Sequence, residues 1–366
     1  RDGINRMLHT ILTFAVISGI VLMGLGLLSA RVVLKASGTP DTVLGQALLY
    51  IRIYFLCVPF MLVYNFGSAI LRSYGDTRRP MYYLIVSGTV NVILNLILVI
   101  CFGLGVAGVA IATVISNVLS AGLVTLHLYH REDEFQFRLR NMKINGQDLK
   151  KILVIGIPAG IQGAIFSVSN VFIQSGINSF GEAAIAGSSL ALNFEYFTYD
   201  IASAFAQAAV TFTSQNYGVG KYKRMDRVLR DCMILSVSVS LIMGILVYVF
   251  GPELLHIYTS EEDVIQCGME ILTYTTLTYF FCGLMDLFPG ALRGMGHSTV
   301  PMILSIVGTV GLRIVWIFLL FPHNRSLDFL FISYPASWIL TFIMQIICFY
   351  FVRKKVHREL KAHFAV

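Results

Sequence analysis

Two carboxylates stand in stretches of the chain that are otherwise almost entirely apolar. Glu195 is followed by Tyr196 and Tyr199, and Asp286 precedes Pro289 by three residues. A carboxylate at the centre of a bilayer costs roughly 2.5–3.5 kcal/mol on insertion scales, so it normally faces a cavity or a partner. Such an acid can hold a proton or a small cation. Both residues are therefore candidates for cation or proton coupling.

Asp200 lies five residues after Glu195. On a helix of 3.6 residues per turn it points about 140° away, so the two acids do not share a face. Glu195 is the better cavity candidate, with Tyr196 and Tyr199 as aromatic neighbours, and Asp200 is a further coupling candidate. The alternative is a protonated Glu195 that hydrogen-bonds to a neighbouring helix.

Asp286 lies one turn before a proline that removes a backbone hydrogen bond. We expect Pro289 to kink its helix and open carbonyl groups towards a cavity. Asp286 would then bind sodium or a proton there. Alternatively, it forms a structural ion pair with Arg313.

Amide side chains recur at helical spacing in two other apolar stretches. Asn91 and Asn95 are four residues apart and share one helix face. A second polar stripe consists of Ser167, Asn170, Gln174 and Asn178. We predict that Asn91, Asn95, Asn170 and Gln174 contribute to a substrate cavity. The alternative for both sets is interhelical hydrogen bonding.

The composition indicates that long membrane helices position these residues. The chain has 366 residues, of which 56% are hydrophobic and 13% are charged, with a mean hydropathy of +0.75. Soluble domains carry about 25% charged residues, and a spanning helix needs about 20 apolar residues. The sequence predicts an all-α polytopic membrane protein with ten such helices. Their ranges are 8–30, 46–70, 80–102, 106–128, 151–179, 183–213, 228–250, 268–291, 300–320 and 327–352.

One polar turn between apolar helices occurs twice. Residues 71–81 return as residues 292–302 with the same Leu, Arg, Gly, Pro and Met at matching positions. Gly75 and Gly296 should adopt positive φ in these turns. Pro80 and Pro301 suit the first turn of the following helix.

The repeat predicts a two-lobed helical bundle. We assign residues 1–130 to an N-terminal lobe of four helices, 131–150 to a cytoplasmic linker and 151–366 to a C-terminal lobe of six helices. Because two more helices precede the second copy of the turn, we expect twelve helices in the complete arrangement, of which the first two are missing here. Two such halves indicate a transporter with a binding site near the midplane where they meet.

Lys and Arg residues concentrate at alternate ends of the predicted helices. The positive-inside rule therefore places both ends of this chain in the cytoplasm of a multi-pass protein of the plasma or inner membrane. Arg72 and Arg293, at the ends of their helices, are expected to point to water or lipid headgroups.

Several motifs together resemble those of multidrug and toxic compound extrusion (MATE) transporters. These motifs are Leu292-Arg-Gly-x-Gly with Pro-Met, Gly156-Ile-Pro158-Ala-Gly160, Phe212-Thr-Ser-Gln-Asn-Tyr-Gly218-Val-Gly-Lys221, and Asn91-Val-Ile-Leu-Asn95 followed by Gly105-Val-Ala-Gly108. The resemblance implies twelve helices in two lobes and export of cationic or amphipathic compounds by antiport with Na⁺ or H⁺. We expect no cofactor. The six cysteines show no CxxC spacing, which gives no indication of a metal site, and the basic residues lie in short loops between apolar segments, which does not indicate a nucleic-acid partner. We expect a monomer in the lipid bilayer.

The chain departs from two patterns of that family. In one branch an Asn and an Asp hold the positions of Asn91 and Asn95, but Asn95 cannot titrate, which argues against proton coupling through the first lobe. The sodium-coupled branch has acids on its seventh helix, whereas residues 151–179 contain none.

Two other functions remain as alternatives. A flippase for lipid-linked polysaccharide or peptidoglycan precursors would favour a large cationic cavity, but Arg313 is the one clear interior cation predicted. An intramembrane enzyme is disfavoured because the chain has no HExxH motif and no paired acids on one helix face.

Overall fold

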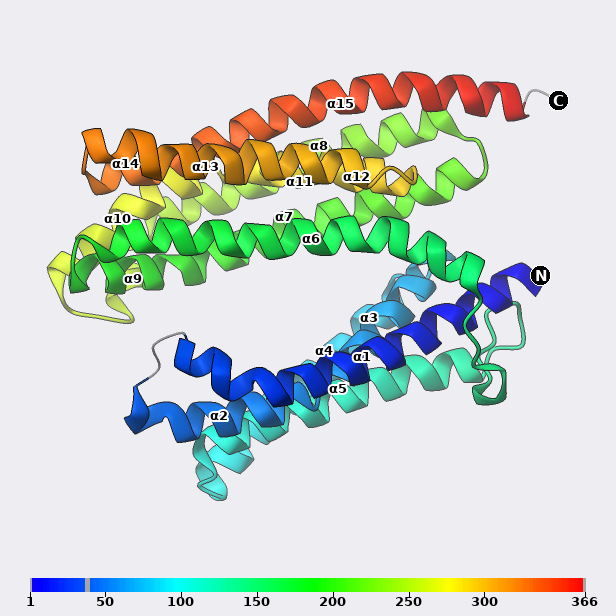
Figure 1. Ribbon diagram of the computed structural model, residues 1–366, viewed down its shortest axis with the longest axis horizontal. Coiled ribbons are helices and arrows are strands. Elements are labelled where there is room, and N and C mark those ends of the chain that lie inside the picture. Colours follow the sequence, from blue (N-terminus) through cyan, green and yellow to red (C-terminus); the bar gives the residue numbers. More distant parts are fainter. Residues whose placement is uncertain (1, 37–39, 365–366) are drawn as a thin grey trace. The chain divides into compact units, whose positions relative to one another are not determined.

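The computed structural model describes residues 2–36 and 40–364, and every regular element in that part of the chain is helical (Figure 1). The all-α prediction is therefore confirmed. The chain divides into two compact units, the first ending at Ile152 and the second beginning at Leu153. The boundary lies inside a long helix. The ten-helix count and the lobe boundaries stay predictions.

The first unit contains five α-helices, a π-helical segment and a short 3-10 turn. They are α1 (Asp2–Ala36), α2 (Asp41–Phe55), α3 (Val58–Ser73), α4 (Arg78–Leu96), η1 (Ile97–Cys101), α5 (Gly105–Tyr129) and η2 (Leu139–Asn141). Helix α3 packs against α1 and α5, and α4 packs against α5 (Figure 1). The absence of a side chain at Gly67 lets α3 approach Val124 of α5. Leu12, Leu71 and Leu128 complete this core.

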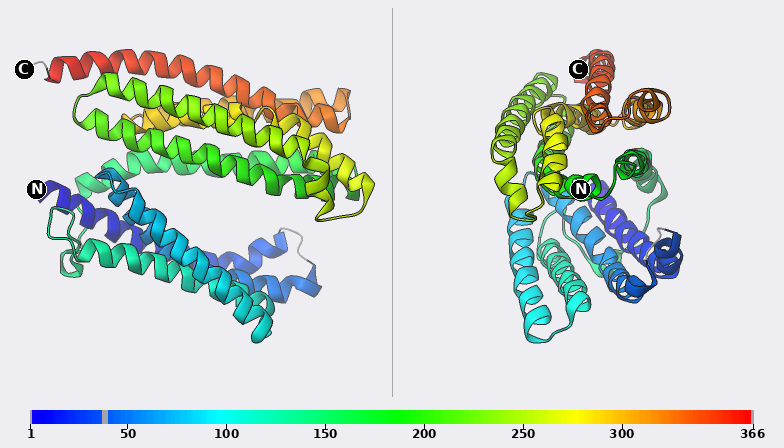
Figure 2. Two further views of the ribbon diagram at one scale, coloured as in Figure 1. Left: turned by 180° about the vertical axis from the view of Figure 1, so that it is seen from behind. Right: turned by 90° about the vertical axis from the view of Figure 1, so that its left-hand side faces the viewer.

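The second unit is larger. Its elements are α6 (Gly146–Asn178), α7 (Glu182–Gly218), α8 (Tyr222–Val249), α9 (Gly251–His256), α10 (Glu262–Thr276), α11 (Tyr279–Gly294), α12 (Thr299–Ser305), η3 (Ile306–Gly311), α13 (Leu312–Val315), η4 (Trp316–Leu320), η5 (Phe321–His323), α14 (Leu327–Phe331) and α15 (Ser333–Phe364). Helices α7, α8 and α15 run lengthwise through it, as the left view in Figure 2 shows. Segments η3 and η4 are π-helical.

Helix α11 forms the centre of this second unit. It packs against α7, α8 and α15, and most of its side chains are buried. A Cβ atom on Gly283 would lie 2.8 Å from Ser236 Oγ of α8, and one on Gly290 would lie 2.8 Å from the Ala206 carbonyl oxygen of α7. Glycines at these contacts therefore bring the helix backbones together, as small residues do between membrane helices.

Seven described helices are long and apolar enough to cross a membrane, and nine if two bent helix pairs each count as one span. The bent pairs are α2 with α3, at 41°, and α10 with α11, at 45°. Helix α7 has 37 residues but falls outside this set by composition. Its sequence contains Glu195 and Asp200 together with many hydroxyl and amide residues.

A bend of 45° lies before α11, between it and α10. Helix α11 continues through Pro289, whereas the break between α10 and α11 falls at residues 277–278. Just before this break, Thr275 and Thr276 donate hydrogen bonds to the carbonyl oxygens of Ile271 and Leu272, at 2.9 and 2.6 Å. Threonine hydroxyls that bond back to the preceding turn often bend helices.

The repeated turn has the same backbone geometry in both copies. The φ angles of Gly75 and Gly296 are 101° and 85°, so both glycines are in the left-handed region. In the first copy Asp76 N donates to the Leu71 carbonyl at 3.1 Å, and in the second His297 N donates to the Leu292 carbonyl at 2.9 Å. This six-to-one bond closes a helix C-terminus around a glycine. The predicted glycine conformations are confirmed.

The prolines after these turns also occupy equivalent positions. Pro80 and Pro301 are each the third residue of a helix, α4 and α12. The Pro80 carbonyl accepts a hydrogen bond from the Tyr64 hydroxyl at 2.8 Å, and the Pro301 carbonyl accepts one from Gln345 Nε2 at 2.8 Å. In each copy a side chain from another helix therefore stabilises the helix that follows the turn.

Candidate functional site

Glu195 lies on the face of α7 that is turned into the second unit. Buried residues recur on this face at helical spacing, namely Ala191, Glu195, Thr198 and Ala202. The other members of this stripe are small, so neighbouring helices approach closely and the longer Glu195 side chain is enclosed. Glu195 is only 5% exposed. The periodicity of α7 thus places a carboxylate inside a helical bundle.

The Glu195 carboxylate is incompletely hydrogen-bonded. Its Oε1 atom has no hydrogen-bond partner among the described residues. Its polar neighbours are Thr275 of α10, which is within hydrogen-bonding reach of the carboxylate, and Arg313 of α13, which interacts with it electrostatically. A buried acceptor without a donor is unfavourable. Adding a proton or a cation would remove this deficit, which makes Glu195 a candidate coupling residue.

Arg313 is the basic group nearest to the centre of this site. It is 5% exposed; its Nη1 donates to Asn170 Oδ1 of α6 at 2.9 Å, and its Nε donates to Ser337 Oγ of α15 at 3.2 Å. The guanidinium carbon lies 4.5 Å from the centroid of the Tyr334 ring. The alternative in which Arg313 pairs with Asp286 is wrong for the described residues, because Arg313 is engaged by amide, hydroxyl and aromatic groups.

Asp286 lies on α11 within a second group of polar side chains. It interacts electrostatically with Tyr199 of α7 and with Arg293, seven residues later on the same helix. Arg293 Nη2 donates to Gln162 Oε1 of α6 at 2.6 Å. These residues link α6, α7 and α11. The expectation that Arg293 points to water or headgroups is wrong, because its side chain turns back into the unit.

The two acids have neighbours in common. Tyr279 and Cys282, both buried on α11, interact electrostatically with Glu195 and with Asp286. We call Glu195, Arg313, Asp286 and Arg293 the interior charge cluster. Two acids and two bases balance its formal charge.

Other predicted site residues lie apart from this cluster. Tyr196 is 62% exposed and Asp200 is also exposed, so neither shares the buried position of Glu195. Gln174 Nε2 donates to Asn178 Oδ1 at 2.9 Å within α6. Of the predicted cavity amides in the second unit, Asn170 alone contacts the interior charge cluster.

Asn91 and Asn95 form a separate amide pair in the first unit. Asn95 Nδ2 donates to Asn91 Oδ1 at 3.0 Å, and Asn91 Nδ2 donates to Ser116 Oγ of α5 at 3.2 Å. The pair therefore joins α4 to α5 by hydrogen bonds. This is the interhelical bonding that the sequence left open, and a substrate-binding role for both residues stays a prediction.

Gln162, Arg293 and Ser337 also belong to the site, although they were not predicted as members of it. One signal was present for Arg293, because two turns separate it from Asp286 and place both on one helix face. Ser337 also belongs to a series of buried hydroxyls at spacing four, with Ser333 and Thr341. For Gln162 no local signal existed. No group of three or more potential metal ligands occurs in the described part of the chain.

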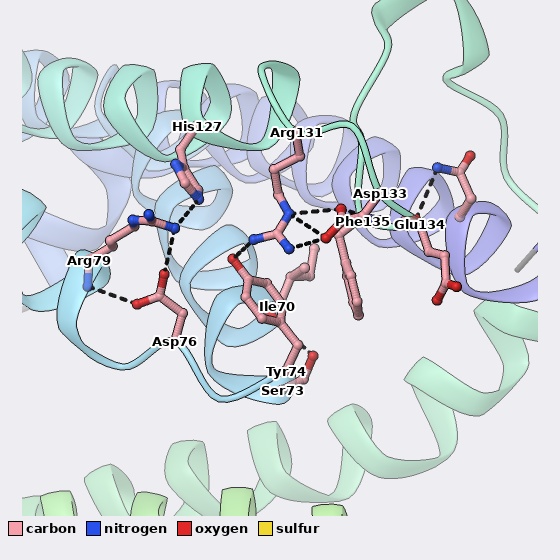
Figure 3. A network of polar contacts seen from close by, with 11 residues as sticks. Ile70, Ser73, Tyr74, Asp76, Arg79, His127, Arg131, Asp133, Glu134 and Phe135 are labelled. Atoms are coloured by element: carbon pink, nitrogen blue, oxygen red, sulfur yellow. Dashed lines mark hydrogen bonds and ion pairs between the residues drawn. The ribbon is translucent and has the colours of Figure 1, made fainter.

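A polar network in the first unit fastens the loop after α5 to the end of α3 (Figure 3). Arg131 donates to Asp133 and to the Tyr74 hydroxyl, and its guanidinium lies 4.1 Å from the Tyr74 ring centroid. The hydrogen bond from Arg131 is the main cause that lowers the pKa of Asp133, and the same bond raises the pKa of Arg131. Beside it, Arg79 bridges Asp76 and His127 (Figure 3).

The rest of this loop lies along the beginning of α1. Asn5 Nδ2 donates to the Gln136 carbonyl at 2.9 Å, and Arg138 N donates to His9 Nε2 at 3.1 Å. A cavity of about 770 Å³ lies here, lined by acidic and basic side chains together. Because both charges line it, the cavity favours no one class of ion.

Comparison with known proteins identifies the family. The sequence model of the MatE family matches residues 1–97 and 158–319. The probable multidrug resistance protein YoeA of Bacillus subtilis is 28% identical over 363 residues, which cover 97% of this chain and 78% of YoeA. The probable multidrug resistance protein NorM of Thermotoga maritima is 27% identical over 311 residues, covering 84% of this chain and 67% of NorM.

A solved structure supports the same conclusion at the level of the fold. The crystal structure of MATE in complex with MaL6 matches with a TM-score of 0.89 at 19% identity, covering 98% of this chain and 81% of that one. Together with the family match over most of the sequence, this shows that the chain belongs to the MatE family of multidrug and toxic compound extrusion transporters.

Proposed function

We propose that the protein exports cationic or amphipathic compounds in exchange for Na⁺ or H⁺, by alternating access of two lobes. Support for export comes from membership of the MatE family and from relatives that are named probable multidrug resistance proteins. Support for coupling comes from one observation above all, the enclosed Glu195 carboxylate whose Oε1 lacks a hydrogen-bond partner among the described residues.

Glu195 and Arg313 supply opposite charges to one buried region. Arg313 is already held by Asn170 and Ser337, so it cannot turn freely towards the carboxylate. A proton or cation that reaches Glu195 adds the missing partner for Oε1. It shifts the transport equilibrium by the difference between its affinities for the two conformations. Coupling at Glu195 thus needs no movement of the Arg313 side chain.

The proposal assigns coupling to the second lobe. Asn95 in the first unit cannot titrate, and the α6 sequence from Lys151 to Asn178 contains no acid. Glu195 and Asp286 are then the principal acids, and Asp200 is a third candidate on an exposed face. The coupling ion is Na⁺ or H⁺, and the proposal includes no cofactor or metal besides this ion.

The membrane arrangement is part of the proposal. At 37 residues α7 is well above the roughly 20 residues that a span requires. Adding α7 to the nine spans above gives ten, which returns both ends of the chain to one side. The distribution of Lys and Arg favours the cytoplasm for that side. We propose a monomer in the cell membrane.

The test is ethidium efflux from drug-sensitised cells that express the protein, with sodium and proton gradients imposed separately. We expect one gradient to drive efflux and Glu195→Gln to abolish it at equal expression. Glu182→Gln is the matched control, because Glu182 is an exposed residue at the start of the same helix. Efflux that neither gradient drives would overturn the proposal, and full activity of Glu195→Gln would remove Glu195 from it.

A further inference from the structure

The last turns of α15 carry two adjacent rows of side chains, most of which are basic. Positions four apart on a helix lie one above the other. One row consists of Tyr350, Lys354 and Arg358, and the other of Arg353, His357 and Lys361. These six residues, all on α15, line one open surface cavity of about 300 Å³. The cavity is distinct from the interior charge cluster and lies at the end of an apolar span.

The second row is anchored by α8. Arg353 binds Asp226 through two hydrogen bonds, Nε to Oδ1 at 2.6 Å and Nη2 to Oδ2 at 2.7 Å. The His357 ring centroid lies 5.0 Å from that of Tyr222, and Lys361 Nζ lies 5.4 Å from the Tyr222 ring centroid. Asp226 thus balances the charge of Arg353. The contacts with α8 hold the second row in place along one side of the cavity.

The first row carries charge that no acid balances. Lys354 and Arg358 are exposed, and neither forms an ion pair within the described part of the chain. The nearest acid on the helix, Glu359, lies 3.9 Å from Lys355 Nζ. With Lys361, the cavity therefore presents three cationic groups that have no acidic partner among the described residues, which suits a phosphate group.

The surface of α15 immediately before the cavity is apolar and exposed. Ile343, Ile347 and Phe351 follow one another at spacing four, and Phe351 is 65% exposed. Tyr350, the first residue of the first row, is 56% exposed. An aromatic residue followed by Lys and Arg at a helix end is typical of the level of lipid headgroups.

We propose that this cavity binds the headgroup of an anionic phospholipid. Lys354, Arg358 and Lys361 contact the phosphate, and an acyl chain lies along Ile343, Ile347 and Phe351. Free phosphate shares the charge chemistry, but it would leave the apolar row unused, and this decides in favour of a lipid. The proposal is independent of the transport function.

The test measures lipid retention by native mass spectrometry of the purified protein, with phosphatidylglycerol and phosphatidylcholine of equal chain length. We expect the protein to prefer phosphatidylglycerol. In the triple variant Lys354→Gln, Arg358→Gln and Lys361→Gln, the ratio of bound phosphatidylglycerol to bound phosphatidylcholine should fall at least about tenfold. Each basic group near a membrane surface contributes to binding anionic lipid. All three side chains are exposed, so the variant should fold normally, which its thermal midpoint without added lipid will check.

Two further measurements show whether the lipid preference comes from this cavity and whether the ligand is a lipid or a free ion. A control triple variant, Arg78→Gln, Arg140→Gln and Lys150→Gln, removes equal charge from exposed positions of the first unit and should keep the preference. An equal loss in the control would overturn the proposal, as would a triple variant at the cavity that binds like wild type. If inorganic phosphate stabilises the protein as strongly as phosphatidylglycerol at equal concentration, the cavity is an ion site and the lipid assignment is wrong.

Discussion

Arg313 Nη1 donates a hydrogen bond to Asn170 Oδ1 over 2.9 Å, which joins α13 to α6 inside the second unit. The same guanidinium reaches Ser337 of α15 through Nε. Other polar links hold α6 in the same way, from Arg293 to Gln162 and from Ser298 Oγ to the Ile155 carbonyl at 2.9 Å. Helix α6 is thus attached to its unit by individual hydrogen bonds, and their loss should have measurable effects.

The first prediction concerns the fork geometry of Arg313. Arg313→Lys keeps the charge, but a single ammonium group cannot reproduce the planar pair of donors that reaches Asn170 and Ser337. We expect the variant to be destabilised by about 1–2 kcal/mol, the scale of interhelical hydrogen bonds in membranes. Thermal unfolding in detergent measures this. The control is Arg325→Lys at an exposed loop position, which should behave like wild type. Equal midpoints for both variants would contradict the prediction.

The second prediction separates the roles of two acids, Asp286 and Asp200. Asp286→Asn removes the charge that faces Arg293 and Tyr199, so we expect ion-driven efflux to fall at least about tenfold. Asp200→Asn changes an exposed side chain and should reduce efflux much less. Vesicle transport at equal protein density, with each gradient imposed in turn, gives the comparison. An Asp200→Asn defect as large as that of Asp286→Asn would place the coupling acid on the exposed face of α7.

Local features of the structure were predictable where a few consecutive residues determine them. Gly75 and Gly296 could be assigned positive φ because each is a glycine in a short polar turn between helices, where glycine readily adopts the left-handed conformation. The buried face of α7 followed from periodicity. Partners such as Gln162 and Arg293 could not be predicted, since periodicity identifies a helix face but not the helix opposite it. The bend before α11 depends on hydroxyls that bond backwards in α10, whereas the sequence drew attention to Pro289.

The third prediction tests the repeated turn. Gly75→Ala and Gly296→Ala place a Cβ in the left-handed region, which costs roughly 1–2 kcal/mol per residue. We expect each substitution to lower the thermal midpoint. Gly88→Ala is the control, because Gly88 is helical, exposed and has open space where a Cβ would lie. That substitution should be neutral or mildly stabilising. If the turn variants are as stable as the control, the two turns tolerate a side chain at this φ.

The fourth prediction follows from the ion pair that holds the loop after α5. The pKa of Asp133 is lowered in the folded protein by the hydrogen bond from Arg131. The stabilising contribution of the pair is therefore complete above the unfolded pKa, near about 3.9, and is lost as the pH falls through the lower folded value. Because Asp133 is largely exposed, the contribution should stay below about 1 kcal/mol.

A double-mutant cycle of Arg131→Gln and Asp133→Asn measures this contribution free of other titrating groups. We expect the coupling free energy to be constant between pH 7 and pH 5 and to decline towards pH 2. Substituting the neighbouring exposed acid, Glu132→Gln, should give no coupling with Arg131 at any of these pH values, since Glu132 makes no ion pair among the described residues. A coupling that is equal at pH 7 and pH 2 would mean that the stacking of Arg131 on Tyr74, and not the charge of Asp133, holds the loop in place.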